Sequence, residues 1–310
     1  MSLSSIKKAI SNEHPLRLGW HKLKAYLAAL RYSFPARHLT IIGITGTDGK
    51  TTTVGMVAHI LHTHGIPVGS LSTAEVRIKN HSTVNHLQKT SPSPFVVQKF
   101  LRKLVTEGCT HAVIECSSHG LLQGRVNFLW PKVGAITNVT PEHLDYHGTM
   151  EKYLDAKAIL FRSLRADGTK VLNVDDWSFA TLDTIPTRRT LAYSVTKQGF
   201  DLSGTDIQSS VRETRATVHS RTGRFDLHLP IPGAFNVQNA LCAIGCANAA
   251  GMRVQDAVKA LGTFQSLPGR MERIDEGQPF SVFIDFTVTP NAFEKTLGTI
   301  REMVGNDHRV

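Results

Sequence analysis

Cysteines and long apolar runs are both scarce in this chain of 310 residues. The four cysteines have no CxxC spacing, which argues against a disulfide framework or a cysteine zinc site; they are Cys109, Cys116, Cys242 and Cys246. We expect all of them to be reduced and mostly buried. No stretch approaches the ~20 apolar residues that span a bilayer, and the first residues lack the apolar region of a signal peptide. The sequence therefore predicts a cytoplasmic protein without a transmembrane segment.

The net charge of +10 is concentrated near the start of the chain. Residues 1–40 carry seven lysines and arginines against one acid, Glu13. A stripe with the spacing of one helix face runs through them, formed by Leu16, Trp20, Leu23, Leu27 and Leu30. We expect a basic amphipathic helical segment over residues 1–38 that packs on the main domain and leaves its basic face in solvent. Contact with a membrane surface or an acidic partner is the alternative. Nucleic acid is disfavoured, because no aromatic-interleaved basic motif accompanies the charge.

The most informative stretch is the sequence TGTDGKTTT at residues 45–53, which directly follows the apolar run 39–44. A strand, a glycine-rich turn and a helix in this order aim several backbone N–H groups at one point, where the positive end of the helix dipole lies. Such a nest binds phosphate, with Lys50 in reach of the terminal phosphates and the Thr51 hydroxyl available to Mg²⁺. The fit to G-x-x-x-x-G-K-[ST] is imperfect, because Ile44 occupies the place of the first glycine. The context nevertheless predicts a nucleotide site.

Beyond this loop, strand patterns alternate with helix patterns. Strands are expected at 67–71, 111–116, 133–138, 170–173, 190–193 and 281–286, and helices at 54–64, 94–107, 150–164, 235–250, 254–261 and from Pro290 onward. This alternation predicts an α/β fold with a doubly wound, mostly parallel sheet. An antiparallel hairpin over 214–230 should lie at its edge. In such a sheet the ligands gather at the carboxyl ends of the strands.

Polar residues cluster where two of these strands end. Glu115 ends one strand, and a carboxylate near a phosphate loop is a natural Mg²⁺ ligand. Asn138 ends the next strand, and three histidines crowd the adjoining loops: His119, His143 and His147. A zinc site and a Ser-His-Asp triad through Ser117 or Ser118 are conceivable alternatives. Neither the helical HExxH spacing nor the G-x-S-x-G elbow accompanies them.

Several motifs, in order, resemble the Mur ligase family, most closely its tripeptide-synthetase (MurE-type) members. They are GTDGKTT at 46–52, ECSSHG at 115–120, TN at 137–138, HLDYHGT at 143–149, Lys157, NVDD at 173–176, GAFNVQN at 233–239, PGR at 268–270, and Asp285 with Thr289 and Pro290. The resemblance covers about 39–300, and the DYHGT string favours these members over folylpolyglutamate synthases. It implies a central ATP-binding domain at 39–277, then a linker and the start of a truncated C-terminal domain at 278–310.

The sequence departs from the family pattern in three places. The usual first domain, which binds uridine diphosphate, is replaced by residues 1–38. Val288 stands where the family has a histidine near the nucleotide, and valine cannot form hydrogen bonds. The sequence stops where the third domain, which selects the added amino acid, should begin. We therefore expect a chain that binds ATP and Mg²⁺ but is incomplete for turnover.

The resemblance implies an ATP-dependent acid–amino-acid ligase (EC 6.3.2 type) of peptidoglycan precursor synthesis. A carboxylate of a nucleotide-linked muramoyl dipeptide would take the γ-phosphate as an acyl phosphate, and the amine of an amino acid would then displace phosphate. A folylpolyglutamate-synthase-like ligase, or a non-catalytic nucleotide-binding subunit that needs a partner, is the alternative.

The same resemblance assigns roles to individual residues. ATP would contact Gly46, Thr47, Asp48, Gly49, Lys50, Thr51, Thr52, Asn239, Arg270 and Asp285. One Mg²⁺ would bind Thr51 and Glu115, and a second would bind Glu115, His143 and a carbamylated Lys157. The catalytic set would be Lys50, Glu115, His143 and Lys157, and the substrate peptide would contact Thr90, Ser91, Ser117 and Arg125.

Overall fold

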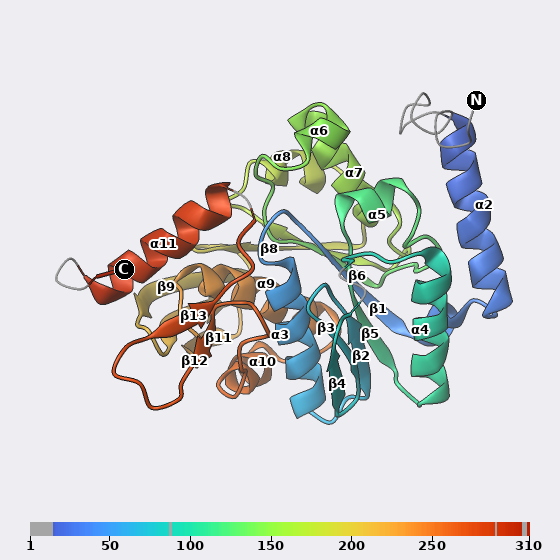
Figure 1. Cartoon of the computed structure of the whole chain (residues 1–310). Coiled ribbons are helices and arrows are strands. Elements are labelled where there is room, and N and C mark those ends of the chain that lie inside the picture. The colour runs from blue at the N-terminus through green and yellow to red at the C-terminus, as the bar shows by residue number, and fades with distance from the viewer. Residues whose placement is uncertain (1–14, 87–88, 289, 306–308) are drawn as a thin grey trace.

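The computed structural model describes residues 15–86, 89–288, 290–305 and 309–310 (Figure 1). Its centre is one sheet of eleven strands in the order β11-β10-β9-β8-β7-β6-β1-β5-β2-β3-β4. These strands are β1 (Thr40–Thr45), β2 (Val68–Leu71), β3 (Glu75–Ile78), β4 (His81–Val84), β5 (His111–Glu115), β6 (Val133–Ile136), β7 (Thr169–Asn173), β8 (Arg189–Ser194), β9 (Leu202–Ser209), β10 (Thr214–Ser220) and β11 (Gly223–Leu229). A separate two-stranded ladder joins β12 (Glu272–Ile274) to β13 (Val282–Ile284).

The middle of the sheet is parallel and both of its edges are antiparallel. Strands β2, β5, β1, β6, β7, β8 and β9 pair in parallel. At one edge β9, β10 and β11 form antiparallel pairs, which confirms the hairpin expected at 214–230. At the other edge β2, β3 and β4 are also antiparallel, a feature that the sequence reading missed.

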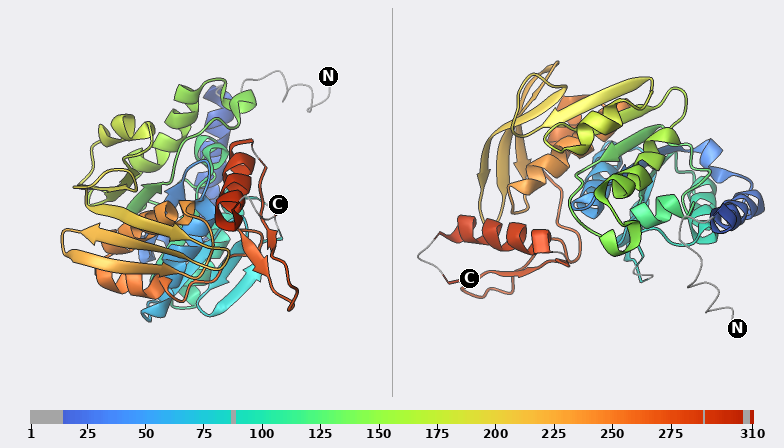
Figure 2. Two further views of the ribbon diagram at one scale, coloured as in Figure 1. Left: turned by 90° about the vertical axis from the view of Figure 1, so that its left-hand side faces the viewer. Right: turned by 90° about the horizontal axis from the view of Figure 1, so that it is seen from above.

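Helices cover both faces of the sheet, as Figures 1 and 2 show. They are α2 (Pro15–Arg31), α3 (Lys50–Thr63), α4 (Pro94–Thr106), α5 (Ser118–Leu122), α6 (Leu144–His147), α7 (Met150–Arg162), α8 (Ser178–Asp183), α9 (Phe235–Ala249), α10 (Val254–Leu261) and α11 (Pro290–Val304), with a short 3-10 helix at Pro35–His38. One apolar cluster joins α3, α9 and α10 to the sheet, and a second joins α4 and α7 to its opposite face. The doubly wound α/β fold is therefore confirmed.

Strand β1 illustrates how the sequence produces this two-sided core. Ile42 and Ile44 belong to one apolar cluster, whereas Ile41 belongs to the other. Successive side chains of a strand point to opposite faces, so a run of β-branched residues fills both layers at once. All four cysteines are buried with free thiols, as expected. None of the described helices is long and apolar enough to cross a bilayer.

Helix α2 corrects one expectation about the basic segment. The apolar stripe was expected to pack on the main domain, but its members are exposed. The helix packs on α4 through small residues instead, namely Ala25, Ala28 and Ala29, because these allow a close approach. Arg102 of α4 fixes the end of the helix by donating to the carbonyl oxygens of Tyr32 and Ser33. Lys7, Lys8, Glu13 and Thr289 lie outside the described residues.

Candidate active site

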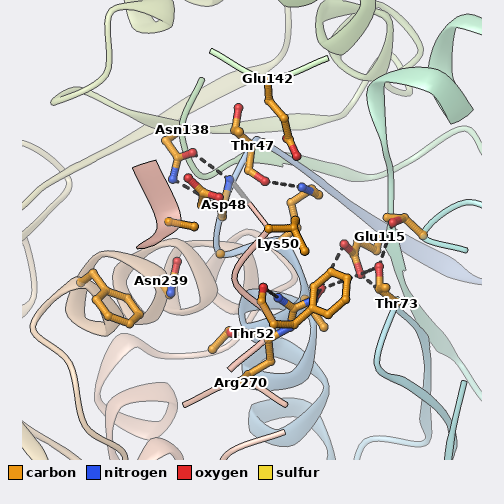
Figure 3. Close-up of a pocket in the computed structure, with 18 of the residues that line it drawn as sticks. Thr47, Asp48, Lys50, Thr52, Thr73, Glu115, Asn138, Glu142, Asn239 and Arg270 are labelled. Atoms are coloured by element: carbon orange, nitrogen blue, oxygen red, sulfur yellow. Dashed lines mark hydrogen bonds between the residues drawn. The ribbon is translucent and has the colours of Figure 1, made fainter. Parts of the chain in front are cut away.

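A cavity of about 340 Å³ lies at the carboxyl ends of β1 and β5 and beside the first turn of α3 (Figure 3). Its walls come from segments far apart in the sequence: the loop before α3, the ends of β5 and β6, helices α7 and α9, and the segment around β13 and α11. This is the place where a doubly wound sheet binds its ligands.

The loop between β1 and α3 follows the path that a phosphate-binding turn requires. Gly46 and Gly49 have φ values of +146° and +79°, a backbone conformation that residues other than glycine rarely adopt. A Cβ added at Gly46 would lie 1.9 Å from Thr137 Oγ1, and one added at Gly49 would lie 2.1 Å from Asn239 Oδ1. Both positions therefore need glycine, for backbone conformation and for space.

Residues at the end of β6 hold this loop in place. Asn138 Oδ1 accepts from the N–H of Asp48 at 3.0 Å, and the Asn138 carbonyl accepts from the N–H of Thr47 at 2.8 Å. The Thr137 hydroxyl donates to the Asp48 carbonyl at 2.6 Å. Lys50, the first residue of α3, lines the cavity and donates its ammonium group to the carbonyl of Thr47. Contacts from the end of β6 and from Lys50 thus fix the loop at the start of a 14-residue helix.

Glu115 is the centre of a buried cluster of oxygen atoms. The residue is 1% exposed, and its carboxylate accepts from the Thr51 hydroxyl at 3.1 Å and from the N–H of Thr73 at 2.7 Å. Arg270 donates to the Thr51 hydroxyl at 3.3 Å. A carboxylate beside a hydroxyl group offers the oxygen ligands that Mg²⁺ prefers, so this donor set fits the ion.

Thr73 was missed by the sequence reading. It follows β2, and β2 pairs in parallel with β5. The rule that polar residues gather where parallel strands end could have found it.

Lys157 lies behind the phosphate loop on α7. Its ammonium nitrogen donates to the carbonyl of Gly46 at 2.6 Å and lies 4.1 Å from the centre of the Tyr153 ring. Burial, helped by the nearby charge of Lys50, holds the pKa of Lys157 well below its usual range. A lowered pKa favours the neutral amine, the form that reacts with carbon dioxide.

Two polar neighbours of Lys157 were not foreseen. Tyr153 lies one helical turn before it, and its hydroxyl is 3.2 Å from Thr47 Oγ1 and 3.4 Å from Glu142 Oε2. Glu142 itself follows the end of β6 and lines the cavity. The i, i+4 spacing of Tyr153 and Lys157 was the available signal.

His143 lines the same cavity as Glu115 and Lys157. It has a left-handed backbone (φ 55°), its side chain is 46% exposed, and its Nε2 lies 3.5 Å from Glu142 Oε1. The His119 ring is 4.7 Å away; burial, followed by the charges of His143 and His147, lowers the pKa of His119 to about 4. Within the described residues no three His, Cys, Asp or Glu side chains converge on one point. The shared metal site of Glu115, His143 and Lys157 therefore stays a prediction.

The residues assigned to the substrate peptide form one connected group. Ser91 accepts from the N–H of Ser117 at 3.0 Å, and Arg125 donates to the Ser91 carbonyl at 2.8 Å. Thr90 accepts from the Thr73 hydroxyl at 2.8 Å, which links this group to Glu115. Thr90 and Ser117 line the cavity, whereas Ser91 and Arg125 are not among its lining residues.

The three assigned nucleotide contacts, Asn239, Arg270 and Asp285, all line the cavity. Asp285 accepts from the N–H of Met271 at 2.8 Å and from the Thr296 hydroxyl of α11 at 3.3 Å. The Arg270 guanidinium lies 5.1 Å from the centre of the Phe286 ring. Val288 also lines the cavity.

Residues 44–247 match the family described as the Mur ligase middle domain. The chain belongs to the Mur ligase family. It is 36% identical over 281 residues to a UDP-N-acetylmuramoyl-L-alanyl-D-glutamate–2,6-diaminopimelate ligase of Thermosynechococcus vestitus, a match covering 90% of this chain and 56% of the relative. A UDP-N-acetylmuramyl-tripeptide synthetase of a Roseiflexus species is 37% identical over 90% of this chain and 57% of its own length.

A solved structure of a UDP-N-acetylmuramoyl-L-alanyl-D-glutamate–2,6-diaminopimelate ligase is similar as well. It superposes with a TM-score of 0.75 and 30% identity, over 86% of this chain and 55% of the other. The resemblance read from the sequence motifs is thus confirmed. The chain spans little more than half the length of these relatives.

Proposed function

We propose that this chain is the nucleotide-binding part of an ATP-dependent ligase that adds an amino acid to a UDP-linked muramoyl peptide during peptidoglycan precursor synthesis. One observation carries the proposal: the buried Glu115 carboxylate meets the Thr51 hydroxyl where the phosphate loop enters α3. Membership of the Mur ligase family and the names of the relatives support the same reaction class.

The phosphate loop would bind the triphosphate of ATP. Backbone N–H groups of residues 46–52 and the positive end of α3 would stabilise the phosphate charges, and Lys50 would neutralise the terminal phosphates. Asn239, Arg270 and Asp285, which line the same cavity, would contact the rest of the nucleotide. The Arg270 guanidinium lies over the Phe286 ring in the lining of this cavity.

Mg²⁺ would be held by Thr51 and Glu115, and a second ion by Glu115, His143 and a carbamylated Lys157. Bound Mg²⁺ would lower the repulsion between the nucleotide and the anionic substrate. Thr73 would orient Glu115 through its N–H, so that the carboxylate keeps one fixed direction. Tyr153 would restrict the movement of the Lys157 side chain by packing its ring against it.

The reaction would proceed in two displacements. A substrate carboxylate oxygen attacks the γ-phosphorus, the bond to the β-phosphate oxygen breaks, and ADP leaves. The amine of the amino acid then attacks the acyl carbon, phosphate leaves, and the amine loses its proton as the amide forms. Thr90 and Ser117, at the end of the cavity next to Glu115, would hold the peptide end of the substrate, with Ser91 and Arg125 supporting them.

An assay of phosphate release tests this function. The chain should be compared alone and after fusion, at its C-terminus, to the remaining C-terminal part of a relative. Each form is assayed with ATP and Mg²⁺, and either with a UDP-linked muramoyl dipeptide and candidate amino acids or with a folate and glutamate. We expect these 310 residues alone to bind nucleotide with little turnover. A domain that closes over the reacting groups orients them, and such orientation can lower the activation barrier by ~7–11 kcal/mol.

Three outcomes of this assay would separate the alternatives. Release that requires both the muramoyl peptide and an amino acid supports the proposal. Release that requires a folate and glutamate would indicate the folylpolyglutamate-synthase-like reaction. Nucleotide binding without any release in the fused protein would indicate a non-catalytic subunit.

A further inference from the structure

Helix α2 lies along the outside of the molecule beside α4, as both Figure 1 and the view from above in Figure 2 show. Its inner side is made of alanines that are completely or almost completely buried: Ala25, Ala28 and Ala29. Arg102 fixes the residue that follows the helix by donating to the carbonyl oxygen of Tyr32 at 2.6 Å. The helix is therefore attached to the protein by its small side chains, and its large ones point outward.

The outward face of α2 is strongly apolar. Trp20, Leu23, Leu27 and Leu30 are exposed by 58, 47, 45 and 53%. Their spacing places all four on one face of the helix, opposite the alanines. Single exposed leucines need no explanation, but a continuous row on one helix marks an interaction surface.

The charges around this row all have the same sign. Helix α2 contains no acidic residue, whereas Lys24 and Arg31 follow the apolar row along one flank and Lys22 lies on the other. Arg37 continues the basic edge just after the helix, where its guanidinium lies 5.4 Å from the centre of the Trp130 ring. Trp130 and Tyr26 are themselves exposed. The surface thus combines leucines, two tryptophans, a tyrosine and basic side chains.

This combination fits a lipid surface better than a second copy of the chain. In an antiparallel pair of such helices, the flank with Lys24 and Arg31 would face the same basic flank of the other copy, and in a parallel pair it would face the flank with Gly19, Lys22 and Tyr26. Neither arrangement supplies an opposite charge. At an anionic membrane, by contrast, leucines enter the acyl boundary, Trp and Tyr take the headgroup level, and Lys and Arg pair with lipid charge.

We propose that α2 is a membrane-surface anchor that binds the protein to anionic lipid while lying in the plane of the interface. The contact is reversible, because one amphipathic helix with a few basic residues gives only moderate affinity. It weakens with added salt, since the lipid charge is then screened. The anchor would hold the cavity of the proposed ligase close to the membrane.

Co-sedimentation with vesicles tests the proposal on the whole 310-residue chain. Vesicles of equal parts phosphatidylglycerol and phosphatidylcholine should pellet the protein at low salt, and vesicles of phosphatidylcholine alone should not. The variant L23E/L27E should lose binding, because both side chains are already exposed and the change places acids against anionic lipid.

A charge-matched pair of variants isolates the electrostatic part. K24Q/R31Q removes two positive charges from the flank of α2, and R188Q/R212Q removes two from exposed positions elsewhere. The first should weaken vesicle affinity roughly tenfold or more, while the second should leave it nearly unchanged. These two charge variants still test the proposal if L23E/L27E fails to fold.

Three results would overturn the proposal. The first is equal binding to both vesicle types, and the second is equal loss of affinity in the two charge variants. The third is a wild-type dimer in light scattering that L23E/L27E converts to monomer while wild type ignores anionic vesicles; the face would then join two copies of the chain.

Discussion

The Thr51 hydroxyl and the Glu115 carboxylate lie 3.1 Å apart, although 64 positions separate them in the sequence. They meet because β1 and β5 are parallel neighbours, with Ile44 paired to Glu115. The first turn of α3 follows β1, so its side chains reach the end of β5.

Replacing Lys50 with alanine should weaken ATP binding. The ammonium group lines the cavity at the phosphate loop, and a hydrogen bond to a charged group contributes ~1.5–3 kcal/mol. We expect the dissociation constant for ATP to rise roughly 10- to 100-fold in isothermal titration calorimetry. Lys99→Ala removes an exposed lysine from α4 and is the control. Unchanged ATP affinity in K50A would mean that this loop does not bind the phosphates of ATP.

Glu115→Gln should uncouple ATP binding from Mg²⁺. The amide keeps the size of the side chain, but it has no negative charge and one oxygen fewer for a hard cation. In the wild type, added Mg²⁺ should tighten ATP binding; in E115Q the affinity should barely respond to Mg²⁺. Titrations with ATP in Mg²⁺ and in EDTA measure the difference. A full Mg²⁺ response in E115Q would place the ion elsewhere.

Gly46→Ala should destabilise the fold more than Gly65→Ala. Both glycines have positive φ, so each substitution carries backbone strain of ~1–3 kcal/mol. At Gly46 the new methyl group also meets Thr137 at 1.9 Å, whereas no atom lies within 4 Å at Gly65. Urea unfolding should show an additional loss of ~1 kcal/mol or more for G46A. Equal losses would mean that the loop moves freely away from β6.

Lys157 should carry a carbamate. Native mass spectrometry in bicarbonate buffer should find a population heavier by one carbon dioxide, which disappears on acidification and is absent from K157A. The amine must be neutral to react, and burial favours that form.

Lys170 provides an internal comparison for this measurement. It is equally buried, and burial also lowers its pKa. Its ammonium group donates to three backbone carbonyls, those of Leu182, Asp183 and Ile185. We expect no adduct there, so an adduct that persists in K157A would contradict the assignment.

The sequence predicted the centre of the sheet well, because β1, β5 and β6 are short apolar runs that end in polar turns. It missed β3 and β4, since His81–Val84 is polar and exposed and gains its strand shape only by pairing with β3. It also misjudged α2. An apolar stripe shows that a helix has two sides, but it does not decide which side packs when the opposite side is rich in alanine.

The sequence named the motif residues of the candidate site, but it did not name the residues that support them. Lys50 and Glu115 follow from local patterns in the sequence, and the roles of His143 and Lys157 were assigned from the family resemblance. Thr73, Glu142 and Tyr153 follow from neither, because their roles depend on which loops come together after folding. Such contacts become visible only once the strand order is known.

The strand β11, at one margin of the large sheet, has a consequence for how the protein behaves at high concentration. Its outward positions carry Arg224, Asp226 and His228, while Leu227 and Leu229 point inward. An unpaired strand edge is a template for other chains, and charged side chains at alternate positions make such pairing costly. Molecules that approach through this edge would have to bury those charges, so the protein should resist strand-by-strand aggregation there.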